Sequence, residues 1–122
     1  MLYAILAYHD PSAITELTPE EDAALMDDLY AAHDRVNAAS KLGPAARLDL
    51  TSQAVTLRGL APGQLIDGPF AETKEALLGL YVVDAASQDA AVAAARELKK
   101  ANPSAVYEIR PITTYLAGKP LE

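Results

Sequence analysis

The sequence contains no cysteine and no tryptophan, and phenylalanine occurs once among its 122 residues. The absence of cysteine excludes a disulfide framework, thiolate zinc sites, iron–sulfur clusters and a thiol nucleophile. Basic residues are also few: 10 lysines and arginines stand against 17 acidic residues, for a net charge of −7. Because these basic residues do not cluster, the sequence has no electrostatic footprint for nucleic acid or for an anionic membrane.

Long apolar runs are absent as well. No run approaches the roughly 20 residues that span a bilayer, and the N-terminus lacks a basic region followed by an apolar stretch and a cleavage site. We therefore expect a cytoplasmic protein. Since a domain usually takes about 100 to 200 residues, and the chain shows neither repeats nor linkers, we expect one domain over residues 1–122.

The negative charge is concentrated in the first third of the chain. Residues 1–40 hold eight acidic residues and one basic residue, whereas residues 41–122 hold nine of each, so the whole excess of −7 lies in the first segment. The eight are Asp10, Glu16, Glu20, Glu21, Asp22, Asp27, Asp28 and Asp34. One interpretation is a solvated helix face with acidic residues near its N-terminus. The alternative is a docking surface for a basic protein partner.

The first part of the chain predicts a strand and then a helix. Residues 2–8, LYAILAY, form a nearly continuous apolar run that is typical of a buried strand. Thr18 then predicts a helix N-cap, with Pro19 at the first helical position and Glu21 closing a capping box. An apolar stripe at helical spacing follows, and we expect this helix to end near residues 41–43. The stripe comprises Leu25, Leu29, Ala32, Val36 and Ala39.

The middle of the chain predicts short strands and turns. Residues 46–50 and 54–58 alternate apolar and polar side chains, and we expect them to pair as a hairpin. Glycine and proline predict a turn at residues 59–63, and residues 64–67 are expected to extend briefly before the next turn.

The last part predicts a strand, a helix and a strand. Residues 79–84 are rich in β-branched and aromatic side chains. Ser87 is expected to cap the next helix, which ends at Asn102 and has one apolar face. That face comprises Ala91, Ala94, Ala95, Leu98 and Ala101. Residues 105–112 predict the final strand, with Tyr107 on one of its faces.

This order of elements predicts an α+β fold. We expect a ferredoxin-like sandwich in which two helices cover one face of a mainly antiparallel sheet. The chain is too short to supply a second helical layer, although its first strand is apolar at nearly every position. We therefore expect the open face of the sheet to be covered by a second copy of the chain, in a homodimer.

The densest group of unusual residues is the run DGPFAETKE, residues 67–75, which is followed by Gly79-Leu80-Tyr81 and Asp84. This run resembles the signature of the YCII-related domain family, and in particular of its DGPF-type branch. The resemblance extends over nearly the whole chain, including the first strand, the Thr18 helix start and the last strand.

The resemblance implies a ferredoxin-like protomer that dimerises through its sheet, in the dimeric α/β-barrel arrangement, with a cleft lined by polar residues. The family has no established reaction. Some members are proposed to be enzymes because polar residues, often a histidine and an aspartate, converge in a pocket, and genes of the DGPF branch often lie near alternative sigma factors. Either His9 or His33 could stand in the place of the family's histidine. The signature positions carried over are Asp67, Gly68, Pro69, Phe70, Glu72, Lys74 and Glu75.

The signature also has a physical interpretation of its own. Gly68 and Pro69 define a turn that would aim Asp67 in one direction. Glu72 and Glu75 would lie on one side of a helical turn, with a nearby lysine biasing their ionisation. These groups are suited to ligand binding or acid–base work. The alternative is that they only order the loop.

Our first functional hypothesis is a protein that binds a small organic molecule in a polar pocket and catalyses a cofactor-free acid–base reaction. His9, at the end of the first strand, would act as acid or base. Asp67 would orient or protonate the bound molecule, and Lys74 would hold an anionic group of it. The expected ligand-binding residues are Asp10, Glu72, Lys74, Glu75 and Tyr81. We expect no cofactor and no metal, since the histidines lack the short spacings of a metal site.

The second hypothesis is a non-catalytic regulatory protein. It would meet a basic partner through the acidic first helix, and the resemblance links it to a sigma factor. A third possibility is a dimer that merely carries a ligand.

Overall fold

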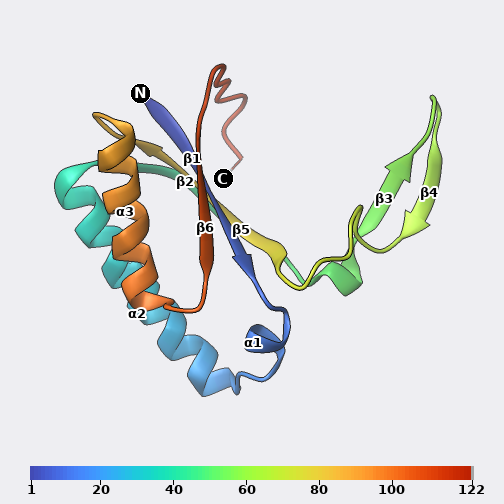
Figure 1. Ribbon diagram of the computed structural model, residues 1–122, viewed down its shortest axis with the longest axis horizontal. Helices are drawn as coiled ribbons and strands as arrows, with labels where there is room; N and C mark the ends of the chain where they lie inside the picture. The colour runs from blue at the N-terminus through green and yellow to red at the C-terminus, as the bar shows by residue number, and fades with distance from the viewer. Residues whose placement is uncertain (122) are drawn as a thin grey trace.

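The computed structural model describes residues 1–121 as one α+β unit (Figure 1). Its elements are β1 (Leu2–His9), α1 (Ser12–Thr15), α2 (Pro19–Ala39), β2 (Lys41–Arg47), a 3-10 turn (Thr51–Gln53), β3 (Val55–Arg58), β4 (Gln64–Asp67), β5 (Ala76–Asp84), α3 (Gln88–Ala101) and β6 (Val106–Pro111). None of the helices within residues 1–121 is both long enough and apolar enough to cross a bilayer.

Four strands form the main sheet in the order β2-β5-β1-β6, with every neighbouring pair antiparallel. The long helices α2 and α3 lie together on one face of this sheet (Figure 1). The predicted α+β class with a mainly antiparallel sheet is therefore confirmed. The strand order is also compatible with a ferredoxin-like arrangement.

Local sequence signals explain where the two long helices begin. The hydroxyl of Thr18 accepts a hydrogen bond from the backbone N–H of Glu21 at 3.1 Å, and the Glu21 carboxylate accepts one from the backbone N–H of Thr18 at 3.0 Å. This is the predicted capping box, with Pro19 in the first turn. Ser87 caps α3 in the same way by accepting from the N–H of Ala90 at 3.2 Å.

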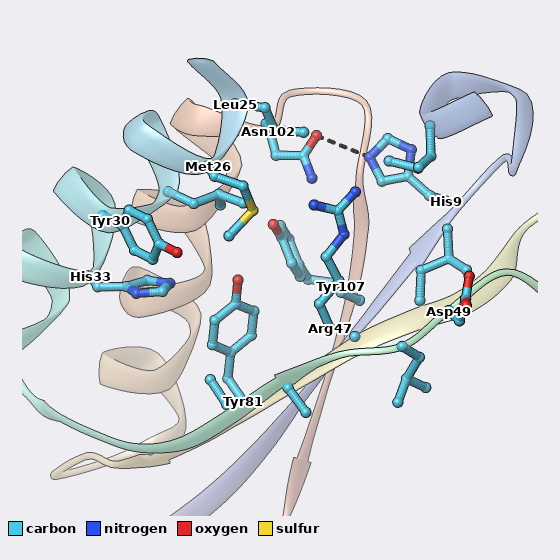
Figure 2. A pocket seen from close by; sticks show the side chains of 18 of the residues that line it. His9, Leu25, Met26, Tyr30, His33, Arg47, Asp49, Tyr81, Asn102 and Tyr107 are labelled. Atoms are coloured by element: carbon cyan, nitrogen blue, oxygen red, sulfur yellow. Dashed lines mark hydrogen bonds between the residues drawn. The ribbon is translucent and has the colours of Figure 1, made fainter. Parts of the chain in front are cut away.

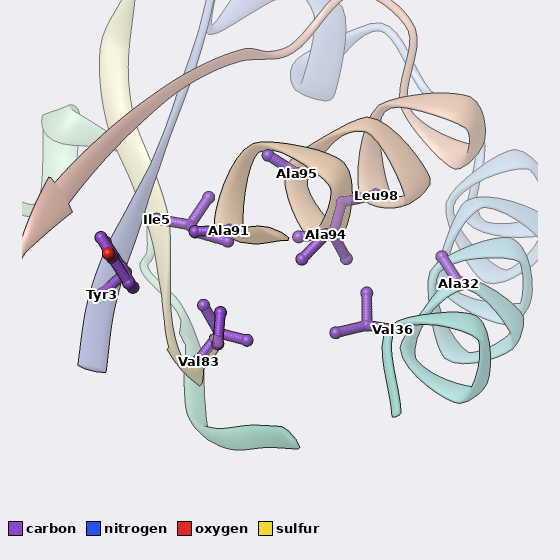
Figure 3. Packing of buried hydrophobic residues seen from close by; sticks show 10 residues of the cluster. Tyr3, Ile5, Ala32, Val36, Val83, Ala91, Ala94, Ala95 and Leu98 are labelled. Atoms are coloured by element: carbon purple, nitrogen blue, oxygen red, sulfur yellow. The ribbon is translucent and has the colours of Figure 1, made fainter. Parts of the chain in front are cut away.

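The hydrophobic core fills only one end of the space between helices and sheet. Figure 3 shows small side chains of α3 packed between the sheet and the second half of α2. The buried cluster comprises Tyr3, Ile5, Ala32, Val36, Val83, Ala85, Ala91, Ala94, Ala95 and Leu98. We call this the filled end. Toward the end of β1 and the start of β5 the same two layers are not filled by side chains.

Helix α2 ends earlier than the sequence predicted. It stops at Ala39, whereas the sequence placed its end near residues 41–43. Residues 41–47 form β2 instead. β2 pairs with β5, and its register shifts between Leu42 and Ala45, where Gly43 and Pro44 lie. A proline lacks the N–H that a regular ladder needs, so the strand accommodates it at this irregularity.

The predicted hairpin between residues 46–50 and 54–58 is wrong. Residues 55–58 form β3, which pairs with β4 in a separate two-stranded sheet. The turn at residues 59–63 is as predicted, but it joins β3 to β4. The short helix α1 was not predicted; the Asp10 carboxylate accepts from the N–H of Ser12 at 3.0 Å where it begins.

The hairpin of β3 and β4 stands away from the main sheet (Figure 1). Leu57 and Leu65 face each other across it, and each is 66% exposed. An isolated two-stranded hairpin is at best marginally stable in water. This segment therefore presents an apolar surface that the rest of its own chain does not cover.

Candidate functional site

A pocket of about 540 Å³ lies between the first half of α2 and the main sheet, at the end opposite the filled end (Figure 2). One wall is apolar and comes from α2, through Leu25, Met26 and Leu29. The floor comes from β1, β2 and β5, where Ala7 and Gly79 leave space. A mostly apolar cavity of this size is typical of small-molecule sites. We call it the helix-side pocket.

Eight polar side chains line the helix-side pocket, from five helices and strands and two connecting segments (Figure 2). They are His9, Tyr30, His33, Arg47, Asp49, Tyr81, Asn102 and Tyr107. Figure 2 shows the phenol of Tyr81, the phenol of Tyr107 and the guanidinium of Arg47 extending into the same space. The fold thus gathers, at one point, polar groups that are far apart in the sequence.

His9 is the most buried of these side chains, with 6% of its surface exposed. Its Nε2 lies 3.0 Å from Oδ1 of Asn102, the residue that caps the C-terminus of α3. Because an amide oxygen only accepts hydrogen bonds, Nε2 carries the hydrogen and Nδ1 is the nitrogen that can take up a proton. The pair fixes the orientation of the imidazole at the edge of the pocket.

The two sheet tyrosines that line the pocket, Tyr81 and Tyr107, are hydrogen-bond donors. Burial raises the pKa of the Tyr81 phenol. Burial, together with the neighbouring Tyr81, also raises the pKa of the Tyr107 phenol. Both phenols therefore remain protonated at neutral pH, and each can donate a hydrogen bond to an electronegative ligand atom.

His33 is half-buried on the inner side of α2. Its ring meets Tyr30 and Tyr81 edge-on, with centroid separations of 6.0 Å and 5.5 Å. Burial lowers the pKa of His33, although the nearby Asp34 partly opposes this. Its Nε2 is buried without a hydrogen-bond partner among residues 1–121. A buried polar atom of this kind usually pairs with water or with a ligand.

Arg47 joins the pocket to the start of α2. Its Nη2 and Nη1 donate to the two carboxylate oxygens of Asp22, at 2.8 Å and 3.3 Å. Both side chains are partly exposed, at 44% and 37%. This hydrogen bond from Arg47 lowers the pKa of Asp22, so the carboxylate is ionised.

The sequence-predicted site residues fall into two groups. His9 and Tyr81 line the helix-side pocket. The signature run starts at the last residue of β4 and ends just before Ala76 of β5. Because Ala76 pairs with His9, the end of the run lies beside the end of β1. Asp10 is close enough to sense Lys74: hydrogen bonds from Ser12, and to a smaller extent the charge of Lys74, lower the pKa of Asp10.

Most of the signature, however, faces a second, more open pocket of about 590 Å³. Pro69, Phe70 and Glu75 line this hairpin-side pocket, and residues 48–50 form a wall that the two pockets share. Asp67, at the exposed end of β4, lines neither of these two pockets.

The charged residues of the signature do not form the helical turn that their spacing suggested. Residues 68–75 are irregular, and Glu72 and Lys74 are exposed. Within residues 1–121, no group of three or more histidine, aspartate or glutamate side chains is arranged to hold a metal ion.

Sequence reasoning missed Arg47 and Asn102 as pocket residues. Asn102 was identified only as the end of a helix, and no local pattern says that a helix cap reaches the end of a strand 93 residues away. Arg47 was assigned to the wrong hairpin. Tyr107 was expected on a strand face, and that face proves to be the one that faces α2.

The fold and the pocket define an α+β protein with a small-molecule-sized cavity between its helix layer and its sheet. Residues 1–115 match the YCII-related domain, so the chain belongs to the YCII-related family. It is also 50% identical over 121 residues, covering 98% of both chains, to an uncharacterized protein of Rhizobium meliloti (strain 1021).

Proposed function

We propose that this protein binds a small organic molecule in the helix-side pocket. The observation that carries the proposal is the convergence of the Tyr81, Tyr107 and Arg47 side chains inside an otherwise apolar cavity of about 540 Å³. An apolar cavity excludes water from a ligand, and a few fixed polar groups orient it. Tyr81 and Tyr107 also pack against the buried cluster of the filled end, whereas Arg47 does not belong to it.

A thermal-shift screen of small metabolites tests the proposal. A ligand at ~100 times its dissociation constant should add about 2.7 kcal/mol to the free energy of unfolding. The shift should shrink in Tyr81→Phe and Tyr107→Phe, which keep the ring and remove the donor. Tyr115→Phe is the matched control, because Tyr115 lies outside the pocket lining. Ligands that cause the same thermal shift in Tyr81→Phe, Tyr107→Phe and Tyr115→Phe would contradict the proposed site.

We further propose that His9 performs cofactor-free acid–base chemistry on the bound molecule. Support comes from its burial at the pocket edge and from the Asn102 hydrogen bond, which orients the ring and leaves Nδ1 as the proton acceptor. Isomerisation or lyase chemistry of this kind moves a proton from carbon. Hits from the screen that exchange a C–H for deuterium in D2O with the wild type, but not with His9→Ala, would support catalysis. Exchange at equal rates would contradict it.

We propose that the active form is a homodimer of the dimeric α/β-barrel type. Alternation along β1 and β5 places Leu6 and Leu80, which are paired in register, on the sheet face away from the helices. That face and the projecting hairpin both present apolar side chains. A second copy would cover them.

The dimer also bears on the proposed roles of Asp67, Glu72 and Lys74. These residues do not line the helix-side pocket of their own chain. We propose that they act at a pocket of the second copy or at the hairpin-side pocket, to which Glu75 belongs. We assign the chain to the DGPF-type branch of the family on the same run, residues 67–75.

A regulatory function is the second candidate, because three acidic residues of α2 are exposed and form no ion pair among residues 1–121. These are Asp27, Asp28 and Asp34. A basic protein partner, such as a sigma factor, would bind them. A pull-down that loses its partner when the three are changed to asparagine would support this candidate, and recovery of only the protein itself would count against it.

A further inference from the structure

The Arg47–Asp22 pair has the geometry of a guanidinium bound to a small carboxylate. Two N–H groups of Arg47 meet the two oxygens of Asp22, at 2.8 Å and 3.3 Å. Arginine commonly recognises carboxylates through this bidentate arrangement. Arg47 is at the same time a lining residue of the helix-side pocket (Figure 2). Asp22, which is not itself among the lining residues, thus holds the charged end of a side chain that lines the cavity.

The other polar groups of the pocket also favour a ligand rich in acceptor atoms. The phenols of Tyr81 and Tyr107 are protonated and can donate. The only acidic side chain of the lining is Asp49, and one of its oxygens already accepts from the backbone N–H of Leu50 at 2.7 Å. Arg47 is thus the pocket's one cationic side chain, apart from its histidines.

Asp22 can release Arg47 without becoming a buried, unpaired charge. It lies in the first turn of α2, where the helix dipole stabilises a carboxylate. Its side chain is 37% exposed, so water can solvate it. Exposed ion pairs contribute little to stability, so replacing the Asp22 carboxylate by that of a ligand costs little free energy.

We propose that the helix-side pocket takes a small organic carboxylate with an apolar body, and that Arg47 binds its carboxylate after exchanging Asp22 for the ligand. The apolar body would pack against Leu25, Met26 and Leu29 of α2. This inference rests on the proposed small-molecule function and specifies its ligand class.

The test compares acids with their neutral amides. Phenylacetate and hexanoate, with phenylacetamide and hexanamide, are titrated into ¹⁵N-labelled protein in a chloride buffer free of carboxylate and phosphate, and binding is followed by NMR shifts around the pocket. The acids should bind about tenfold more tightly, because hydrogen bonds to charged groups are stronger than neutral ones. Arg47→Gln should abolish this preference. Asp22→Asn should tighten the binding of the acids and leave the amides unchanged.

Arg35→Gln is the matched control. Arg35 forms an exposed pair with Glu97 at 2.9 Å, outside the pocket lining, so the preference should survive its loss. Equal binding of acids and amides, or a preference that survives Arg47→Gln, would overturn the inference and leave the proposed function intact. If none of the four probes shifted the pocket signals at millimolar concentration, the carboxylate inference would fail, whereas the proposed function would fail only if the metabolite screen also gave no hit that depends on Tyr81 and Tyr107.

Discussion

Nε2 of His9 donates to Oδ1 of Asn102 across 3.0 Å and so joins the end of β1 to the C-terminus of α3. The two residues are 93 positions apart, and His9 is almost fully buried. A buried polar side chain needs a partner, and here the partner also fixes which way the imidazole faces. One contact therefore contributes both to the fold and to the candidate site.

Asn102→Ala should lower the free energy of unfolding by about 1 to 3 kcal/mol, because it leaves the His9 imidazole buried without its partner. Urea unfolding measures the loss. In a His9→Ala background the same substitution should cost much less, since no imidazole remains to be satisfied. Equal costs in the two backgrounds would show that the hydrogen bond contributes nothing.

Stability should fall as the pH is lowered from 7.5 to 5.5. Burial lowers the pKa of His33 in the folded state. As the pH falls through about 6.5, His33 is therefore protonated in the unfolded chain but still neutral in the folded chain. The stabilisation is complete above pH 6.5 and is lost as the pH falls through that value toward the folded pKa. His33→Gln should flatten this part of the profile, as measured by urea unfolding at the two pH values.

The carboxyl groups do not obscure this comparison. Hydrogen bonds lower the pKa values of Asp10, Glu21, Asp22 and Glu97 below the ordinary range of carboxyl groups, about 4, so these groups titrate below the pH range used. A slope between pH 7.5 and 5.5 that is identical in wild type and His33→Gln would contradict the burial of a neutral His33.

Loss of the capping box should destabilise the protein and weaken the pocket together. Thr18→Ala removes the acceptor for the Glu21 N–H, which typically costs about 1 kcal/mol. The first half of α2, which begins at this cap, also forms the apolar wall of the pocket, so ligand binding should weaken. Thr15→Ala, an exposed threonine of α1, is the control and should change neither urea stability nor binding.

Two leucines should differ in what their truncation costs. Leu98 has no exposed surface in the filled end, and Leu98→Ala should cost about 2 to 5 kcal/mol. Leu25 faces the pocket and already lacks neighbours on one side, so Leu25→Ala should cost less than half as much in urea unfolding. Similar losses at both positions would mean that the pocket is packed closed in solution.

The homodimer can be tested by size-exclusion chromatography with light scattering. Wild type should elute with twice the mass of one chain, whereas Leu80→Lys, which places a charge on the open face of the sheet, should be monomeric. Leu116→Lys is the control, because Leu116 is 85% exposed in the C-terminal tail. A wild-type mass of a single chain would refute the proposed assembly.

Elements that depend on neighbouring residues were predictable from the sequence. Thr18 and Glu21 are three residues apart, and their reciprocal hydrogen bonds require nothing from the rest of the fold. The cap at Ser87 and the apolar face of α3 are equally local. The α+β class follows from the order of such elements.

Strand partners and pocket residues were harder to predict because they depend on the whole fold. Residues 54–58 alternate equally well for either neighbour, but in the fold β2 pairs with β5 and β3 pairs with β4. Arg47 reaches Asp22 from 25 residues away, through that same pairing. His9 and Tyr81 were found because strand ends and tyrosines on strands are common in sites, whereas Asn102 carried no such signal.

The split between a filled end and a cavity has a consequence for how this family can change over time. The buried cluster is concentrated around α3 and the second half of α2, whereas the apolar wall of the cavity comes from the first half of α2; Tyr81 and Tyr107 line the cavity and also pack against the cluster. Substitutions of apolar wall residues such as Leu25 and Met26 should therefore cost less folding free energy than substitutions in the buried cluster. Such a scaffold is evolvable: relatives can acquire new ligand preferences while the architecture persists.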